Sequence, residues 1–178
     1  MKNDHTVIFA GILTYTGAQN PGCSVPTGLQ AMGRNFDINS FFKDHWYVTH
    51  MKDVTSNSYD AVCREYKTYL KDGLVKIDAD GVYTIKGIKK HYPTICSTGT
   101  PPIAHGSIRL QCSHADQNGN KVSFIFFTVI WTIIETNYKD YALAYRCTWY
   151  NDNSIHTGNL LLLQRKKSAE GSEATSSL

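Results

Sequence analysis

An arginine within one strand-like run is the first residue that could do chemistry. Arg64 alternates with Val62 and Tyr66, whereas Glu65 and Lys67 occupy the other face of the same run. Successive side chains of a strand point to opposite faces, so Arg64 and Tyr66 face inward if Glu65 and Lys67 face solvent. A guanidinium in an apolar interior is costly unless it is paired. The pattern predicts a bidentate site for an anionic ligand, with an internal carboxylate partner or an exposed arginine as the alternatives.

A second arginine stands in a run with small neighbours. Arg146 shares one face of residues 141–150 with Ala142, Ala144 and Thr148, and bulkier residues occupy the other face. Small side chains on one face would leave room for a ligand beside the guanidinium. The sequence leaves open which face is inward, so Arg146 is expected either at a ligand site or in solvent.

A histidine suggests a different ligand class. His50 alternates with Trp46 and Val48, and Asp53 follows it closely. If His50 lines a cavity, the imidazole and the carboxylate could together receive an amine. The alternative is a solvated pair at the end of a strand.

Motifs for enzymes, metals and nucleic acids are missing from the sequence. It contains no G-x-S-x-G, H-E-x-x-H or P-loop motif and no C-x-x-C pair, and its seven histidines are scattered. The net charge is only +3, and basic residues gather at Lys86, Lys89 and Lys90 alone. We therefore expect a protein that is not an enzyme, holds no metal and has no nucleic-acid partner.

One antiparallel β domain would position these residues. Hairpin signals, Asp80-Gly81 and Asn118-Gly119 among them, separate eight strand-like runs. These runs are residues 45–51, 59–70, 74–78, 82–88, 107–114, 122–134, 141–150 and 160–165. We expect a short helix within 36–42 and a loop over 91–102. Eight such strands predict an all-β, up-and-down barrel that could hold one small ligand, with a β-sandwich as the structural alternative.

The two ends of the chain differ from this domain. Residues 1–18 have the form of a secretory signal, with Lys2, an apolar run over 7–13 and small residues at 16–18; a buried first strand is the alternative. The longest later apolar run, 124–134, is too short to cross a bilayer as a helix. We predict a signal peptide over 1–18, one domain over 19–167, a polar tail over 168–178, and a secreted protein without a membrane anchor.

Three segments carry a family resemblance. Residues 41–49 (FFKDHWYVT), 135–147 (ETNYKDYALAYRC) and 160–165 (LLLLQR) resemble the triabin/pallidipin branch of salivary lipocalins from blood-feeding bugs, which are related to nitrophorins. The similarity extends from residue 23 to residue 167. Asp44 stands where lipocalins usually carry a glycine two residues before the first-strand tryptophan.

The resemblance implies a lipocalin barrel whose closed end is formed by Trp46 beneath Arg165. It also implies two disulfides, Cys23–Cys147 and Cys96–Cys112. Cys63 would remain a free thiol, because the cysteine that pairs with it in the family is missing near the C-terminus.

Prostanoid-binding members of this branch use an arginine and a glutamine at positions that correspond to Arg64 and Gln164. Nitrophorins hold haem through a histidine in the third strand, and residues 74–78 contain none, so no haem or other cofactor is expected.

The function implied by the resemblance is sequestration of a small host mediator. An eicosanoid such as thromboxane, a biogenic amine or ADP would be removed stoichiometrically by a secreted monomer, which would inhibit platelet aggregation and haemostasis. The alternative is a protein-binding lipocalin whose surface inhibits a clotting protease such as thrombin.

Overall fold

The computed structural model describes residues 24–53, 61–85, 88–91, 93–103, 105–115, 121–150 and 156–167. Within these ranges it describes the side chains except those of residues 53, 61–64, 81–85, 88–90, 121–125 and 156. The predictions for the signal peptide, the C-terminal tail and the Asn118-Gly119 turn fall outside this part. No helix in the described residues has the length and apolar character needed to span a membrane.

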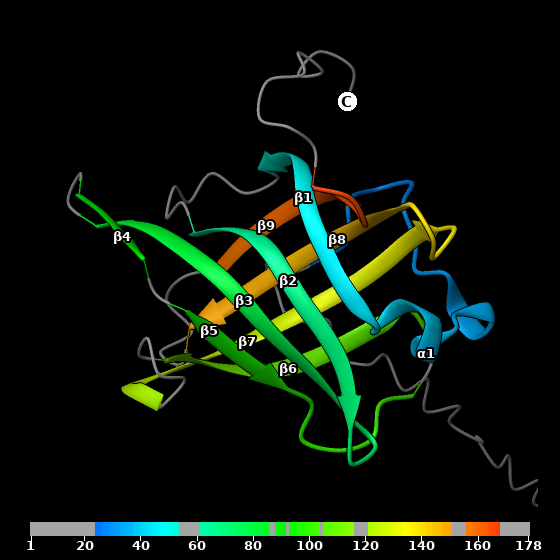
Figure 1. Cartoon of the computed structure of the whole chain (residues 1–178). Coiled ribbons are helices and arrows are strands. Elements are labelled where there is room, and N and C mark those ends of the chain that lie inside the picture. Colours follow the sequence, from blue (N-terminus) through cyan, green and yellow to red (C-terminus); the bar gives the residue numbers. More distant parts are fainter. Residues whose placement is uncertain are drawn as a thin grey trace, which may run out of the picture.

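Two short helices precede nine strands (Figure 1). The helices are the 3-10 helix η1 (Gly33–Asn35) and α1 (Ile38–Phe41). The strands are β1 (Asp44–Asp53), β2 (Ala61–Lys71), β3 (Leu74–Ile85), β4 (Ile88–His91), β5 (Thr94–Ser97), β6 (Ser107–Ala115), β7 (Lys121–Thr136), β8 (Tyr141–Tyr150) and β9 (His156–Gln164). The helix expected within 36–42 is therefore α1, which begins after Asp37 because its carboxylate accepts hydrogen bonds from the backbone N–H groups of Asn39 and Ser40.

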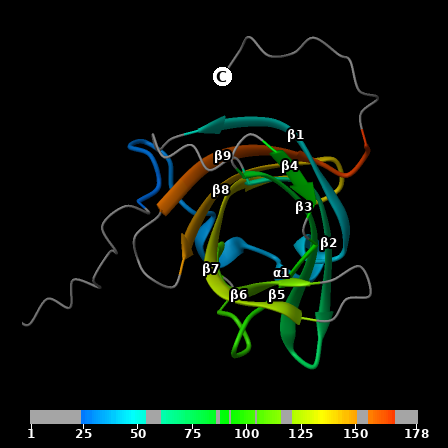
Figure 2. The same ribbon diagram turned by 90° about the vertical axis from the view of Figure 1, so that its left-hand side faces the viewer.

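The strands close into an antiparallel barrel, which confirms the predicted fold. The sheet order is β2-β1-β9-β8-β7-β6-β5-β3-β4, and a further β2–β3 pairing closes the ring seen in Figure 2. β4 and β5 both pair with β3, β5 along its first half and β4 along its second. Nine strand segments thus occupy the eight positions of a lipocalin-like barrel.

One predicted hairpin is wrong. Residues 74–78 and 82–88 do not form two strands around Asp80-Gly81, because β3 runs through this dipeptide without reversing. Asp80 and Gly81 instead pair with Glu65 and Cys63 of β2. The chain reverses earlier, at Asp72 and Gly73, both of which have positive φ angles. Part of the expected loop over 91–102 forms β5. The two strands expected on either side of Asp80-Gly81 are thus one strand, β3, and β5 supplies the strand position that this merger removes.

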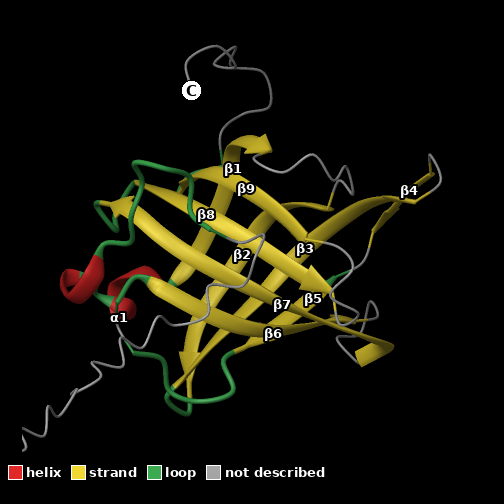
Figure 3. Ribbon diagram, turned by 180° about the vertical axis from the view of Figure 1, so that it is seen from behind, coloured by secondary structure: helices red, strands yellow, loops and turns green. Residues whose placement is uncertain are grey.

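Helix α1 covers one end of the barrel (Figure 3). The side chains of Trp46 and Arg165 stack on each other at this end. The Arg165 guanidinium lies 3.6 Å from the centre of the Trp46 ring, and the indole N–H of Trp46 donates to the carbonyl of Phe41 over 3.0 Å. Trp46 and Phe41 are fully buried. This is the closed end, so any cavity must lie beyond Trp46 toward the opposite end of the strands.

A disulfide joins the directly opposed residues Cys96 of β5 and Cys112 of β6. Cys147 is also disulfide-bonded, and its partner sulfur lies outside the described atoms. Cys23 and the side chain of Cys63 are not among the described parts. The Cys23–Cys147 bridge and the free Cys63 thiol therefore remain predictions.

Candidate functional site

Strand β8 presents Arg146 to the barrel interior. Ala142 and Ala144 are fully buried in the main core, and Arg146, on the same face, retains 5% exposure. The other face is buried too, because Tyr145, Cys147 and Trp149 form an outer cluster against residues that include Val25 and Ile130. The face with small residues is thus the inward one, which places Arg146 inside the barrel.

Two neutral side chains hold the guanidinium of Arg146 in place. Its Nη1 donates to the Tyr66 hydroxyl and its Nη2 donates to Oδ1 of Asn159, both over 2.7 Å. Tyr66 is itself fixed by an edge-to-face contact with Trp131, with 4.8 Å between ring centres. β2, β8 and β9 therefore each contribute one polar group to a single cluster within the core.

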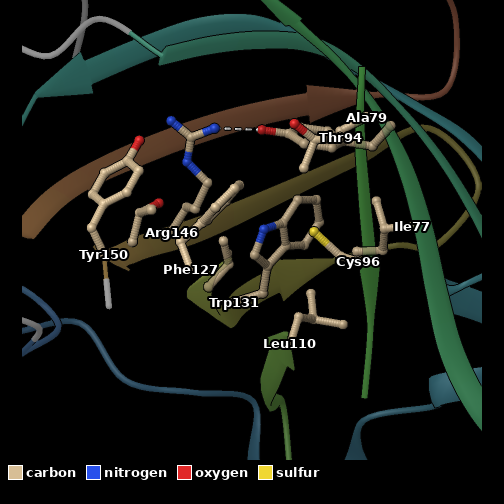
Figure 4. Close-up of a pocket in the computed structure, with 12 residues that line it drawn as sticks. Ile77, Ala79, Thr94, Cys96, Leu110, Phe127, Trp131, Arg146 and Tyr150 are labelled. Atoms are coloured by element: carbon tan, nitrogen blue, oxygen red, sulfur yellow. Dashed lines mark hydrogen bonds between the residues drawn. The ribbon is translucent and has the colours of Figure 1, made fainter. Parts of the chain in front are cut away.

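This cluster borders a small internal cavity of about 30 Å³ (Figure 4). Its lining combines polar groups on β2, β5 and β8 with an apolar wall. The lining residues are Tyr66, Ile77, Ala79, Thr94, Cys96, Leu110, Phe127, Val129, Trp131, Arg146, Thr148 and Tyr150. None of these twelve described residues is a carboxylate, and the described residues contain no cluster of histidine, cysteine and acidic side chains that could hold a metal. The cavity wall is therefore amphipathic and carries a positive charge.

A histidine lies behind this lining. Nδ1 of His114 is 3.3 Å from the Thr94 hydroxyl, and its ring centre is 5.3 Å from that of Phe127. Burial lowers the pKa of His114 below its ordinary value because the charged imidazolium is poorly solvated there. His114 is therefore neutral at physiological pH, and the positive charge at the cavity is that of Arg146.

The structure brings Tyr66 and Arg146 together but separates them from Gln164. On β9, Leu161 and Leu163 are fully buried in the core, and Gln164 alternates with them onto the outer face. Gln164 pairs with Tyr47 and Tyr141 near the closed end. This placement corrects the expectation that Gln164 reaches a ligand inside the barrel.

His50 is also on the outer face, contrary to the prediction from alternation. A β-bulge separates Val48, which pairs with Leu163, from His50, which pairs with Leu162. Thr49 is the extra residue, so the inward position after Val48 belongs to Met51, which packs against the core. The side chain predicted to receive an amine, His50, therefore does not face the barrel interior.

A similar bulge affects Arg64. In the β2–β3 ladder Cys63 pairs with Gly81 and Glu65 pairs with Asp80, so Arg64 is the extra residue between them. Strict alternation from Tyr66 back to Arg64 does not hold across such a bulge. The Arg64 side chain is outside the described part, and its role as a ligand contact remains a prediction.

Asn159 was missed because the last strand was expected to begin at residue 160. The structure begins β9 at His156 and pairs Asn159 with Arg146. A hairpin register counted outward from residues 149 and 156 brings these two residues together.

Comparison with known proteins identifies the family. The Triabin family model matches residues 20–177. The chain belongs to the triabin family. This confirms the resemblance to triabin/pallidipin-type lipocalins found in the sequence.

Relatives in blood-feeding bugs cover nearly all of this triabin-family chain. Triafestin-1 of Triatoma infestans is 31% identical over 168 residues, which cover 93% of this chain and 79% of the relative. Pallidipin of Meccus pallidipennis is 32% identical and covers 84% of this chain and 77% of its own length. The tryptamine complex of the amine binding protein of Rhodnius prolixus superimposes with a TM-score of 0.64 at 19% identity, over 84% of this chain and 73% of that one. At this identity the structural likeness shows the shared lipocalin-like fold.

Proposed function

We propose that this protein is a secreted, monomeric lipocalin that sequesters a small amphipathic anion, an eicosanoid such as thromboxane, and thereby inhibits platelet aggregation. The observation that carries the proposal is the guanidinium of Arg146, buried within the barrel and hydrogen-bonded to Tyr66 and Asn159. Secretion is supported by the predicted signal peptide. Such a carrier acts by stoichiometric capture and needs no catalytic group.

The chemistry of the cavity suits a ligand with one anionic end and an apolar body. A carboxylate can accept charge-assisted hydrogen bonds from a guanidinium, and these are stronger than bonds between neutral groups. The Tyr66 hydroxyl beside Arg146 would donate a second hydrogen bond to the same carboxylate. Ile77, Leu110 and Phe127 on the facing wall would cover hydrocarbon. The binding site is thus expected to bind the anionic end of a ligand by hydrogen bonds and its hydrocarbon body by apolar contacts.

Binding must enlarge the cavity. Sites for small organic ligands usually measure about 300–1,000 Å³, whereas the cavity among the described side chains is about 30 Å³. Arg146 and Tyr66 would therefore move when a ligand enters. Because Tyr66 packs on the edge of Trp131, ligand binding should also change the tryptophan fluorescence.

The small cavity also favours a second candidate. A lipocalin whose interior is filled by its own side chains could act through its surface, as an inhibitor of a clotting protease such as thrombin. A biogenic amine is a weaker candidate, since Arg146 would repel an ammonium group in this interior of low dielectric.

Titration calorimetry with a thromboxane analogue, ADP, serotonin and thrombin separates these possibilities. We expect binding of the thromboxane analogue, weakened about tenfold to a hundredfold by Arg146→Gln, as is typical of losing a hydrogen bond to a charged group. Arg109→Gln is the matched control, because Arg109 is exposed on β6. Equal affinity of wild type and Arg146→Gln, or tight binding of serotonin alone, would refute the anion site. Heat from thrombin alone would favour the protease inhibitor.

A further inference from the structure

The barrel wall changes partners beside the cavity. β3 pairs with β5 as far as the rung between Ala79 and Thr94, and then with β4 from Val82 onward. On its other side β5 pairs with β6, whereas β4 has β3 as its neighbour in the described sheet. Figures 1 and 3 show β4 turned away from the end of β6. Among the described residues, the ladder of hydrogen bonds around the barrel is therefore interrupted beyond the Ala79–Thr94 rung.

A groove of about 420 Å³ lies on the outer side of this interruption. Its lining includes the carboxylates of Glu65, Asp78 and Asp80, and also Ala79, Thr94 and Ile95. Ala79 and Thr94 also line the internal cavity. The cavity and the groove therefore lie on the inner and outer sides of the sheet at the same pair of residues.

The hydrogen-bonded cluster of Tyr66, Arg146 and Asn159 lies next to this rung. Tyr66, which accepts the hydrogen bond from Arg146, is the cross-strand partner of Ala79. Figure 4 shows the hydrogen bond of Arg146 directed toward the side of the cavity where Ala79 and Thr94 lie. A ligand held by Arg146 therefore has the thin part of the wall next to it.

We propose that the ligand passes through the barrel wall just beyond the Ala79–Thr94 rung, where β4 and β5 separate, with its anionic end at Arg146 and a polar far end in the outer groove. This inference rests on the proposed function and specifies the ligand further. The cavity alone is too small for an eicosanoid, and the groove supplies adjoining volume. The ligand class is a long amphiphile with polar groups at both ends.

The groove determines which polar group suits the far end. Glu65, Asp78 and Asp80 line it together with one lysine. Their present contacts are with side chains that donate: His45 lies 3.5 Å from Glu65, the Tyr69 hydroxyl lies 3.4 Å from Asp78, and His91 contacts Asp80. A group that donates hydrogen bonds, such as a hydroxyl or an ammonium, fits these carboxylates.

Two probes of equal length test the proposal. Dodecanoate has one anionic end, and its ω-amino derivative carries an ammonium at the other end. We expect the double variant Asp78→Asn/Asp80→Asn to weaken the ω-amino derivative about threefold to tenfold, as for partly exposed ion pairs, and to leave dodecanoate unchanged. The double variant Asp72→Asn/Asp140→Asn, in two exposed turns at the closed end, is the control of matched charge. Backbone amide NMR signals of Asp78, Asp80 and Ile95 should shift with the ω-amino derivative.

The outcomes separate this inference from the proposed function. If both probes depend on Arg146 but neither depends on the groove aspartates nor shifts their amide signals, the passage through the wall is wrong and the internal anion site stands. If neither probe binds, or if binding ignores Arg146→Gln, both proposals are wrong. Dependence of the ω-amino derivative alone on the two aspartates supports the extended site.

Discussion

At the scale of single residues, Asn159 sets the charge of the barrel interior. Its amide oxygen accepts the hydrogen bond from Nη2 of Arg146 at a position where a carboxylate oxygen would fit equally well. Asparagine and aspartate have nearly the same shape, so Asn159→Asp would change the charge of this contact with little change in packing. Arg146 would then be neutralised from within the protein.

We predict that Asn159→Asp weakens binding of the thromboxane analogue at least tenfold, because the new carboxylate competes with the ligand for the guanidinium. Serotonin binding should improve, since repulsion of its ammonium is removed. Calorimetry of both ligands checks this. Asn39→Asp, exposed on α1, adds the same charge elsewhere and should change neither affinity.

His114 should make the stability of the barrel depend on pH. Burial lowers its pKa from 6.5, so the unfolded chain binds a proton at a pH where the folded protein does not. The free energy of unfolding should be at its full value above pH 6.5 and should fall as pH decreases toward the lowered pKa. Urea titrations between about pH 7.5 and about pH 5 should show this slope reduced in His114→Gln. The exposed His105→Gln serves as control, and an unchanged slope in His114→Gln would contradict the prediction.

At the scale of elements, β-bulges explain which site residues could be predicted from the sequence. Arg146 and its small neighbours lie on β8, where alternation holds, and the structure only had to decide which face is inward. His50 follows the bulge at Thr49, and Arg64 stands within the bulge of β2. A bulge adds one residue and so inverts the faces of everything beyond it. No local sequence signal marks either bulge, so the predicted faces were wrong or unsupported there.

The fold itself was predictable for a similar reason. β6, β7 and β8 are long alternating or apolar strands. The expected bounds of β8 agree with the observed ones, and those of β6 and β7 differ by at most two residues at either end. The Asp80-Gly81 turn signal failed because β2 pairs with both residues, on the two sides of the bulge at Arg64. Local turn propensity was outweighed there by a neighbouring strand that the sequence could not place.

The bulge in β1 can be tested by deletion. Removing Thr49 leaves Val48 opposite Leu163 and His50 opposite Leu162 in a regular ladder, so the barrel should fold with little loss of stability. Removing Val48 restores the same regular ladder but places Thr49 in the inward, partly buried position opposite Leu163. We expect the second deletion to be less stable by about 1–2 kcal/mol, because a hydroxyl replaces a methyl group in the core. Urea unfolding compares the two, and equal stability would contradict the assigned bulge.

At the scale of the whole molecule, Arg165 joins segments that are far apart in the sequence. Its guanidinium donates to the carbonyls of Ser40, Phe41, His45 and Tyr138 over 3.0–3.2 Å, and also to that of Lys43. Burial lowers its pKa to about 10, so it stays charged at physiological pH. The end of β9 thereby holds α1, the start of β1 and the turn before β8 in one arrangement.

Arg165→Lys should therefore destabilise the whole barrel. A lysine cannot reproduce the planar fork or the stacking on Trp46, and we expect a loss of about 2–4 kcal/mol in the free energy of unfolding. The dependence on urea concentration should keep its slope, because the same surface is exposed on unfolding. The exposed Arg34→Lys is the matched control, and a loss no larger than in that control would show that Arg165 is not a cross-link.

The position of β8 also has a consequence for the order in which the barrel opens. β8 is paired along its full length with β7 and β9 and is buried on both faces, whereas β4 has four paired residues on one side. Amide protons of β8 should exchange with solvent deuterium only when the whole molecule unfolds, and those of β4 through small local openings. Arg146 would then stay in place during fluctuations that loosen the wall beside it. A bound ligand could leave when β4 opens locally. Its residence time would then be set by the rate of this opening and not by the global stability of the protein.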